Sequence, residues 1–238
     1  MNAAGASAGT LPETQVRAMF DRIARVYDLM NAVMTVGMHA RWRERAADLA
    51  ALAPGGRALD VATGTGDLAI ALKRRVGSAG SVVGVDFAER MLELARRKAP
   101  DVRFEAANAL ALPYPDGEFD AATVGFGARN FHDLRAGLSE LARVVRPGGR
   151  VVVLEITRPE RAPLSHFFRL WFDSAVPLLG RLAGDPDAYA YLPRSVRRFP
   201  GPRELAGELA AVGLVEVRWV LTAGGIIAIH AGTVGGSS

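Results

Sequence analysis

The sequence has no cysteine, only two lysines among its 29 basic residues, and no long apolar run. Without cysteine, neither a disulfide framework nor a thiolate metal site can form, and the four histidines show no metal-ligand spacing, so we expect no metal. No segment reaches the roughly 18 apolar residues of a membrane span. Residues 1–12 lack the basic and apolar regions of a signal peptide and are predicted to be a disordered tail. These absences predict a cytoplasmic protein.

The charge of the chain does not single out a nucleic-acid partner. The formal net charge is +4, and the arginines lie in short clusters beside 25 acidic residues. Solvated helix faces explain such clusters most simply, with a phosphate or an anionic membrane surface as the alternative. We therefore expect no nucleic acid as a partner. Half of the residues are apolar, which suffices for the core of one domain over residues 13–238.

A glycine turn between an apolar strand and a helix is the most informative motif. Residues 57–69 read RALDVATGTGDLA, and residues 82–86 read VVGVD. Gly64 and Gly66 lack a Cβ, so the backbone can turn sharply and approach a ligand closely. Asp86, 20 residues after Gly66, can accept hydrogen bonds from both hydroxyls of a ribose. The motif predicts a nucleoside cofactor.

The charge around this turn favours one nucleoside over another. The glycine spacing also fits the fingerprint of a nicotinamide dinucleotide, which remains an alternative. A helix N-terminus attracts anions, so the carboxylate of Asp67 at that position would compete with a pyrophosphate. Together with Asp60 at the end of the strand, it suits the sulfonium and ammonium groups of S-adenosylmethionine. We predict this cofactor, with Asp60, Gly64, Gly66 and Asp86 among its binding residues.

The hydrophobic pattern predicts an α/β fold. Residues 13–53 have helical spacing and form a helical cap before the first strand. Strands are then predicted over residues 58–62, 82–86, 102–105, 119–124 and 150–156, and helices over residues 67–76, 88–99 and 134–145. Alternation of this kind implies a parallel sheet with right-handed crossovers, helices on both faces, and a ligand at the carboxyl ends of the strands.

A third motif, RPGGR over residues 146–150, is a proline-glycine turn that leads into a buried strand. With Asp60, the glycine turn and Asp86 in this order, the sequence resembles the class I S-adenosylmethionine-dependent methyltransferases. The resemblance implies a Rossmann-like, mostly parallel sheet of seven strands that ends in an antiparallel hairpin. Residues 214–222 and 225–232 have the pattern of that hairpin.

Further segments resemble the ubiquinone/menaquinone biosynthesis C-methyltransferase family. They read FDRIARVYDLMN over residues 20–31, GMHARW over 37–42, GFGARN over 125–130, YAYLPRS over 189–195, and GGIIAIH over 224–230. The resemblance spans nearly everything from residue 20 to residue 230. It implies cofactor contacts at Thr63, Asp86, Asn108 and Ala109. The sequence departs from the family at Gly125, where a serine is common, so a hydroxyl contact to the cofactor is lost there.

The resemblance also implies a reaction. Members methylate a ring carbon of a polyprenylated hydroquinone and release S-adenosylhomocysteine. Conversion of demethylmenaquinol to menaquinol is the leading expectation, with 2-polyprenyl-6-methoxy-1,4-benzoquinol of ubiquinone synthesis as the near alternative. Methylation of another small molecule at oxygen or nitrogen, and a nicotinamide-dependent dehydrogenase, are more distant alternatives. A homodimer is also kept open.

Methylation of a quinol ring carbon requires a group that assists loss of a phenolic proton. A phenol has a pKa of about 10, so the site must supply a base or a nearby positive charge. The resemblance places Tyr27, Arg129, Asn130 and His132 there as catalytic candidates. Arginine can stabilise a phenolate and histidine can transfer a proton. A local role for His132, which precedes a potential helix cap at Asp133, is an equal alternative, as is a core position for Tyr27.

An acceptor lid is predicted over residues 157–200, after the fifth strand. Residues 163–184 are crowded with apolar side chains, which fit a groove for a polyprenyl tail, a membrane-facing patch, or simple packing of the lid. The first two interpretations place the protein peripherally at the inner face of the membrane. The predicted acceptor-binding residues are Tyr27, Asn31, Arg129, Phe168, Trp171 and Tyr191.

Overall fold

The computed structural model describes residues 13–159, 162, 164–170 and 186–236. The strands are β1 (Arg57–Val61), β2 (Ser81–Asp86), β3 (Arg103–Ala106), β4 (Phe119–Gly125), β5 (Val145–Ile156), β6 (Leu214–Thr222) and β7 (Ile227–Val234). The α-helices are α1 (Glu13–Thr35), α2 (Met38–Leu49), α3 (Asp67–Val76), α4 (Glu89–Lys98), α5 (Leu134–Val144), α6 (Leu164–Leu170), α8 (Pro186–Arg198) and α9 (Pro202–Ala211). Short 3-10 turns, η1 (Ala128–Asn130) and η3 (Ala223–Gly225), follow β4 and β6. The predicted tail, residues 1–12, and Trp171 lie outside the described residues.

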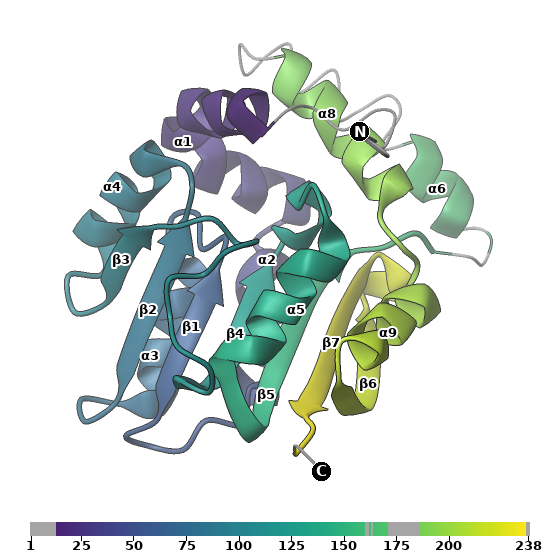
Figure 1. The fold of residues 1–238 in the computed structure, drawn as a ribbon. Coiled ribbons are helices and arrows are strands. Elements are labelled where there is room, and N and C mark those ends of the chain that lie inside the picture. The colour runs from purple at the N-terminus through teal and green to yellow at the C-terminus, as the bar shows by residue number, and fades with distance from the viewer. Residues whose placement is uncertain (1–12, 160–161, 163, 171–185, 237–238) are drawn as a thin grey trace, which may run out of the picture.

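The sheet has seven strands in the order β3-β2-β1-β4-β5-β7-β6 (Figure 1). Strands β1 to β5 pair in parallel, whereas β7 runs antiparallel to both of its neighbours, β5 and β6. This confirms the predicted parallel sheet with an antiparallel C-terminal hairpin. The hairpin turns at η3, where Gly224 has a φ of 67° and an added Cβ would lie 2.1 Å from the side chain of Leu164.

Two hydrophobic cores lie on opposite faces of the sheet, as alternation along β5 illustrates. Val151 and Val153 pack with α5 and α9, whereas Val152 and Leu154 pack with α2, α3 and α4. Successive side chains of a strand point to opposite faces, so a strand buried on both sides is apolar throughout. Each of these buried side chains stabilises the fold by about 1.5–3 kcal/mol. The prediction of helices on both faces is confirmed.

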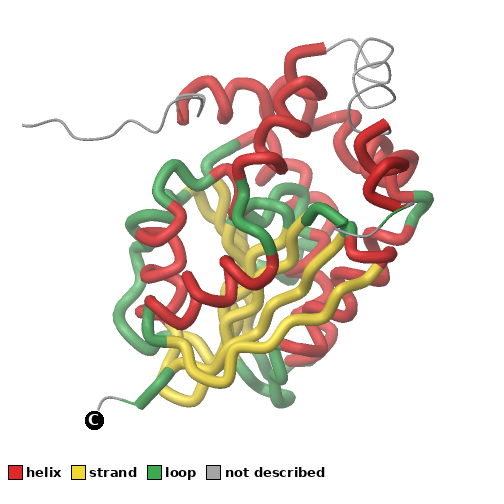
Figure 2. Tube along the Cα trace, turned by 90° about the vertical axis from the view of Figure 1, so that its right-hand side faces the viewer, coloured by secondary structure: helices red, strands yellow, loops and turns green. Residues whose placement is uncertain are grey.

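The predicted helical cap, residues 13–53, divides into two helices with different roles. Helix α1 lies with α8 above the carboxyl ends of the strands (Figures 1 and 2). It packs through Val16, Met19 and Ile23 against Met91 of α4 and Tyr191 of α8. Helix α2 instead packs on a face of the sheet, with Trp42 and Ala46 in the main core. Of the two cap helices, α1 is therefore the one that lies above the strand ends (Figure 1).

The proline-glycine motif is a bulge inside β5 instead of a turn before it. Val145 pairs with Phe119, and pairing resumes only between Arg150 and Ala121. Gly148 has a φ of 77°, and an added Cβ at Gly149 would lie 2.5 Å from a backbone carbonyl. The strand continues on both sides of the extra residues, so the expected start at residue 150 is wrong.

Candidate active site

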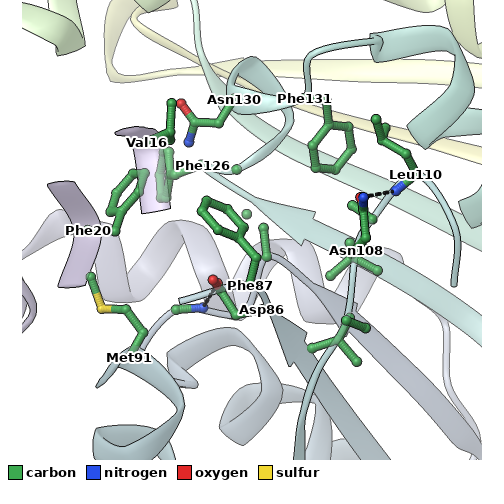
Figure 3. A pocket seen from close by; sticks show the side chains of 18 of the residues that line it. Val16, Phe20, Asp86, Phe87, Met91, Asn108, Leu110, Phe126, Asn130 and Phe131 are labelled. Atoms are coloured by element: carbon green, nitrogen blue, oxygen red, sulfur yellow. Dashed lines mark hydrogen bonds between the residues drawn. The ribbon is translucent and has the colours of Figure 1, made fainter. Parts of the chain in front are cut away.

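A first cavity lies between the carboxyl ends of the strands and α1 (Figure 3). It has a volume of about 60 Å³. Asp86 and Phe87 line it at the end of β2, and Gly125 and Phe126 at the end of β4, while Phe20 of α1 covers it. Parallel strands direct their carboxyl ends to the same edge of a sheet, which is where α/β proteins bind ligands.

Asp86 is held in place by two backbone amides. Its Oδ2 accepts a hydrogen bond from Gly64 N at 2.8 Å, and its Oδ1 accepts one from Ala88 N at 2.9 Å. Burial raises the pKa of Asp86, while these backbone donors oppose the shift. Each carboxylate oxygen keeps a lone pair for a ribose hydroxyl. An added Cβ on Gly64, whose φ is 55°, would meet no atom within 4 Å, so this wall is open to a ligand. The residues present thus fit a nucleoside.

Three other predicted cofactor residues lie behind this wall. Asp60 is buried and accepts hydrogen bonds of 2.6 Å from the hydroxyls of Thr63 and Thr123. Burial raises the pKa of Asp60 to about 6, against the effect of these two donors. An added Cβ on Gly66 would lie 2.8 Å from the ring of Phe104, so this glycine lets α3 pack closely. Direct contact of Asp60, Thr63 or Gly66 with the cofactor stays a prediction.

Asp67, which the sequence placed beside the positive groups of the cofactor, forms ion pairs with protein side chains instead. Its carboxylate pairs with Lys98 at 2.8 Å and with Arg43 at 3.5 Å, and it does not line the first cavity. Lys98 also pairs with Asp28 of α1 at 2.7 Å. Asp67 therefore joins α3 to α4 and, through Lys98, to α1. The carboxylate that faces the cavity is that of Asp86.

Asn108 and Ala109, two of the predicted cofactor residues, line the first cavity. Asn108 also forms the local turn, because its Oδ1 accepts a hydrogen bond from Leu110 N at 2.9 Å (Figure 3). His132 lies at the exposed edge of the same cavity. Its neighbour Asp133 caps α5 by accepting a hydrogen bond from Ala136 N at 3.0 Å, which confirms the expected cap.

The second cavity is larger and mostly apolar, with a volume of about 380 Å³. It lies under α1 and is also lined by residues of α6, α8 and η3. The predicted acceptor residues that line it are Tyr27, Asn31, Arg129, Phe168 and Tyr191. The structure thus brings together, from segments far apart in the sequence, every predicted acceptor residue within its described part.

The two cavities share a wall of three aromatic residues, Phe20, Tyr27 and Phe126. The ring of Phe20 packs edge-on against Tyr27, with centroids 6.2 Å apart. Phe126 has a φ of 60°, a strained conformation for a bulky residue that is typical of functional sites. A hydrogen bond of 3.2 Å from the Tyr191 hydroxyl to Asn130 Oδ1 links the two cavities as well.

A buried ion pair lies at this junction. Arg129 Nη1 is 2.8 Å from Glu155 Oε1, and both side chains are almost fully buried. Nη1 also donates to the carbonyl of Phe126, whereas Nε has no hydrogen-bond partner within the described residues. Burial raises the pKa of Glu155, and the positive charge of Arg129 opposes this shift.

Sequence reasoning missed Glu155 and two residues of the aromatic wall, Phe20 and Phe126. The signal for Glu155 is an acidic residue directly after the buried run Val151–Leu154, at the carboxyl end of a central strand. Such a position in a parallel sheet favours function over packing. Phe126 had no comparable signal, because a phenylalanine after a strand is equally typical of a core.

The comparisons with known proteins agree with this geometry. The model of the ubiE/COQ5 methyltransferase family matches residues 9–234. A demethylmenaquinone methyltransferase of Thermus thermophilus is 50% identical over 219 residues, which cover 90% of this chain and 99% of the relative. This chain belongs to the ubiE/COQ5 methyltransferase family. Membership confirms the resemblance noted in the sequence, the enzyme class and the S-adenosylmethionine cofactor.

Other relatives extend the comparison within and beyond the ubiE/COQ5 family. A ubiquinone/menaquinone biosynthesis C-methyltransferase UbiE of Teredinibacter turnerae is 38% identical, with 92% of this chain and 91% of the relative covered. A solved S-adenosylmethionine-dependent methyltransferase of Thermotoga maritima superposes with a TM-score of 0.65 at 21% identity, over 91% of this chain and 98% of that one. This structure supports the Rossmann-like fold.

Proposed function

We propose that this methyltransferase transfers a methyl group from S-adenosylmethionine to a ring carbon of a polyprenylated quinol, converting demethylmenaquinol to menaquinol. The observation that carries the proposal is the aromatic wall shared by two cavities. One cavity presents the carboxylate of Asp86, which suits a nucleoside, and the other is mostly apolar, with Arg129 in its lining. A donor and an acceptor bound in these cavities meet at that wall.

The chemistry requires the reduced ring. A quinone carbon is electrophilic, whereas a hydroquinone carbon becomes nucleophilic once a neighbouring hydroxyl loses its proton. S-adenosylmethionine supplies the methyl group: a carbon–carbon bond forms, the carbon–sulfur bond breaks, and the ring carbon then releases its proton. The enzyme must align the reacting atoms and exclude water. The aromatic wall, between two cavities covered by α1, supports both tasks.

We assign to Arg129 the role of stabilising the phenolate of the acceptor. Its guanidinium lines the acceptor cavity and can stabilise the developing oxyanion, and its Nε has no hydrogen-bond partner within the described residues. Glu155 orients the guanidinium through its ion pair with Nη1. Asn130 and Tyr191, which hydrogen-bond to each other, and Tyr27 complete the polar part of this region, while His132 at the cavity edge is the candidate proton acceptor.

The choice of naphthoquinol rests on the relatives. The Thermus thermophilus relative, at 50% identity, has a name that specifies demethylmenaquinone. The Teredinibacter turnerae relative, at 38%, has a name that covers both ubiquinone and menaquinone synthesis. The benzoquinol is therefore the second candidate acceptor. Because the acceptor carries a polyprenyl tail, the proposal includes peripheral contact with the membrane.

Turnover of matched quinols tests the function. The full chain is incubated with S-adenosylmethionine and chemically reduced, short-tail demethylnaphthoquinol or demethylbenzoquinol, and the products are identified by mass spectrometry. We expect the naphthoquinol to be methylated on carbon, with faster turnover than the benzoquinol, and the oxidised quinones to remain unchanged. Methylation of neither quinol would contradict the proposal, and faster turnover of the benzoquinol would replace the acceptor.

A further inference from the structure

The end of α1 and the turn into α2 form an uncharged corner. Residues 29–38 read LMNAVMTVGM. Four of their side chains are exposed, namely Leu29 (64%), Val33 (52%), Val36 (85%) and Met38 (43%). We call these four residues the α1–α2 corner. Leu29 and Val33 lie one helical turn apart on the outer face of α1, so their side chains are neighbours.

The inner side of the same segment lines the larger cavity. Met30 and Met34 face this cavity, and Val36 and Met38 of the corner also line it. A surface helix normally has a polar outer face, whereas here the last two turns of α1 are apolar on both sides. The corner is thus continuous with the mouth of the acceptor cavity, so whatever covers it also meets a ligand that leaves that cavity.

The charges beside the corner are positive. Arg41 and Arg45, one turn apart on α2, are exposed and have no ion-pair or hydrogen-bond partner within the described residues. Asp28, the acidic residue that precedes the corner, is paired with Lys98. Anionic lipid headgroups attract such arginines, while exposed aliphatic side chains insert between the headgroups.

We propose that the α1–α2 corner docks on an anionic lipid bilayer, with Arg41 and Arg45 against the headgroups. This inference rests on the proposed function, because a polyprenylated acceptor gives the docking its purpose. The cavity of about 380 Å³ is near the lower end of ligand sites and holds the ring and the start of the tail, while the rest of the tail stays in the bilayer. No helix in the described part of the chain is long and apolar enough to cross a membrane.

Vesicle binding measured without any quinol tests the docking surface independently of the proposed function. The full chain is co-sedimented with vesicles of phosphatidylglycerol and phosphatidylcholine, or of phosphatidylcholine alone. The test variant is Leu29→Ser/Val33→Ser, because these side chains do not line either cavity. The matched control is Val215→Ser/Leu221→Ser on β6, where two apolar side chains have similar exposures of 50% and 51%.

We expect the test variant to lower the partition coefficient for anionic vesicles about tenfold, and the control to leave it unchanged. Arg41→Gln/Arg45→Gln should remove most of the preference for anionic over neutral vesicles. All variants should retain turnover of the short-tail quinol, which shows that they are folded, and the test variant should lose turnover of a long-tail quinol in vesicles.

Two outcomes would overturn the docking surface. One is equal vesicle binding by the wild type and the test variant. The other is that the wild-type chain does not bind vesicles but forms a dimer in analytical ultracentrifugation, whereas the test variant is monomeric. This result would assign the corner to contact with a second copy of the chain. Absence of methylation with every quinol would instead refute the proposed function and leave a measured vesicle contact standing.

Discussion

The buried pair of Arg129 and Glu155 couples the stability of the protein to its chemistry. Two charges in a low-dielectric interior stabilise each other, but removal of one leaves the other without compensation, at a cost of about 3–5 kcal/mol. Loss of activity in a single variant at either position would therefore mix a folding defect with a catalytic one. A pair of variants separates the two effects.

We predict that Arg129→Ala destabilises the fold by about 3–5 kcal/mol, because Glu155 is left buried and unpaired. Arg129→Ala/Glu155→Gln should recover much of that stability, since the neutral amide needs no counterion. Turnover of the double variant should stay about 100-fold or more below that of the wild type, with the Kd for S-adenosylmethionine nearly unchanged. Denaturant unfolding, kcat and calorimetry measure the three quantities. Recovery of turnover in the double variant would remove Arg129 from the catalytic assignment.

Burial of His230 should lower the free energy of unfolding of the protein in mild acid. The ring is fully buried, Nε2 donates to the carbonyl of Pro202 at 2.8 Å, and Nδ1 has no hydrogen-bond partner within the described residues. Burial lowers the pKa of His230 below its ordinary value of 6.5. Below pH 6.5 the unfolded chain therefore binds a proton that the folded chain does not. The contribution of His230 is complete above this pH and falls as the pH drops through it, by at most about 1.4 kcal/mol per pH unit.

Substitution of His230 tests this assignment. His230→Gln keeps a donor for the Pro202 carbonyl but cannot take up the proton, so its free energy of unfolding should fall less than that of the wild type between pH 7.5 and 5.5. His166→Gln, at an exposed histidine of α6, is the control and should keep the slope of the wild type. An unchanged slope in His230→Gln would mean that other groups cause the loss.

At the level of elements, local signals explain which predictions succeeded. Helix α3 has the predicted bounds, residues 67–76, because a glycine turn precedes it and a glycine follows it. The motif at residues 146–149 carries equally strong turn residues, yet it became a bulge, because Val145 still pairs with Phe119 across the interruption. Pairing partners are set by the sheet, so a local signal cannot reveal them.

In the candidate site, too, some features could be predicted from local sequence signals and others could not. The carboxylate of Asp86 and the flexible Gly64 were predictable, since each has a physical role at a fixed distance from a turn. The division of the cap was not predictable, because amphipathic spacing shows that a helix has an apolar side but not what that side contacts. Only the packed structure shows that α1 covers two cavities and that Phe126 separates them.

A network of polar contacts fastens α1 to the body of the protein. Lys98 Nζ donates to Asp28 of α1 at 2.7 Å, to Asp67 of α3 at 2.8 Å, and to Thr65 Oγ1 at 3.2 Å. The hydroxyl of Thr65, which is buried, donates to Asp28 at 2.6 Å. Lys98 thus balances the carboxylates of Asp28 and Asp67, which would otherwise repel each other where α1 meets α3.

We predict that Lys98→Met loosens α1. The Kd for S-adenosylmethionine should rise about three- to tenfold, because exposed ion pairs contribute little individually and this variant breaks two of them. Hydrogen exchange of the α1 amides should become faster. Arg97→Met, at the preceding exposed position of α4, is the matched control and should alter neither quantity. Equal effects of the two variants would show that general charge, and not the network, holds α1.

On the scale of the whole molecule, α1 belongs to both cavities and, through its far end, to the proposed docking surface. Phe20 and Tyr27 contact both ligand spaces, and Met34 lies near the end of the same helix. A ligand in the first cavity therefore contacts the helix that also forms the acceptor cavity. Binding of the cofactor should for this reason stabilise the molecule as a whole and not only a loop at the strand ends.

The size of this stabilisation distinguishes the two nucleosides that the glycine turn allows. A ligand at 100 times its Kd stabilises the folded state by about 2.7 kcal/mol, which corresponds to a rise in Tm of roughly 5–10 °C for a chain of this size. We expect S-adenosylmethionine and S-adenosylhomocysteine to produce such a rise, and NAD at the same concentrations to produce none, because the first turn of α3, where a pyrophosphate would bind, carries the carboxylate of Asp67. Asp86→Ala should abolish the response to the first two ligands, whereas Asp101→Ala, at an exposed aspartate outside the cavity, should retain it. A comparable rise with NAD would show that the site accepts a dinucleotide.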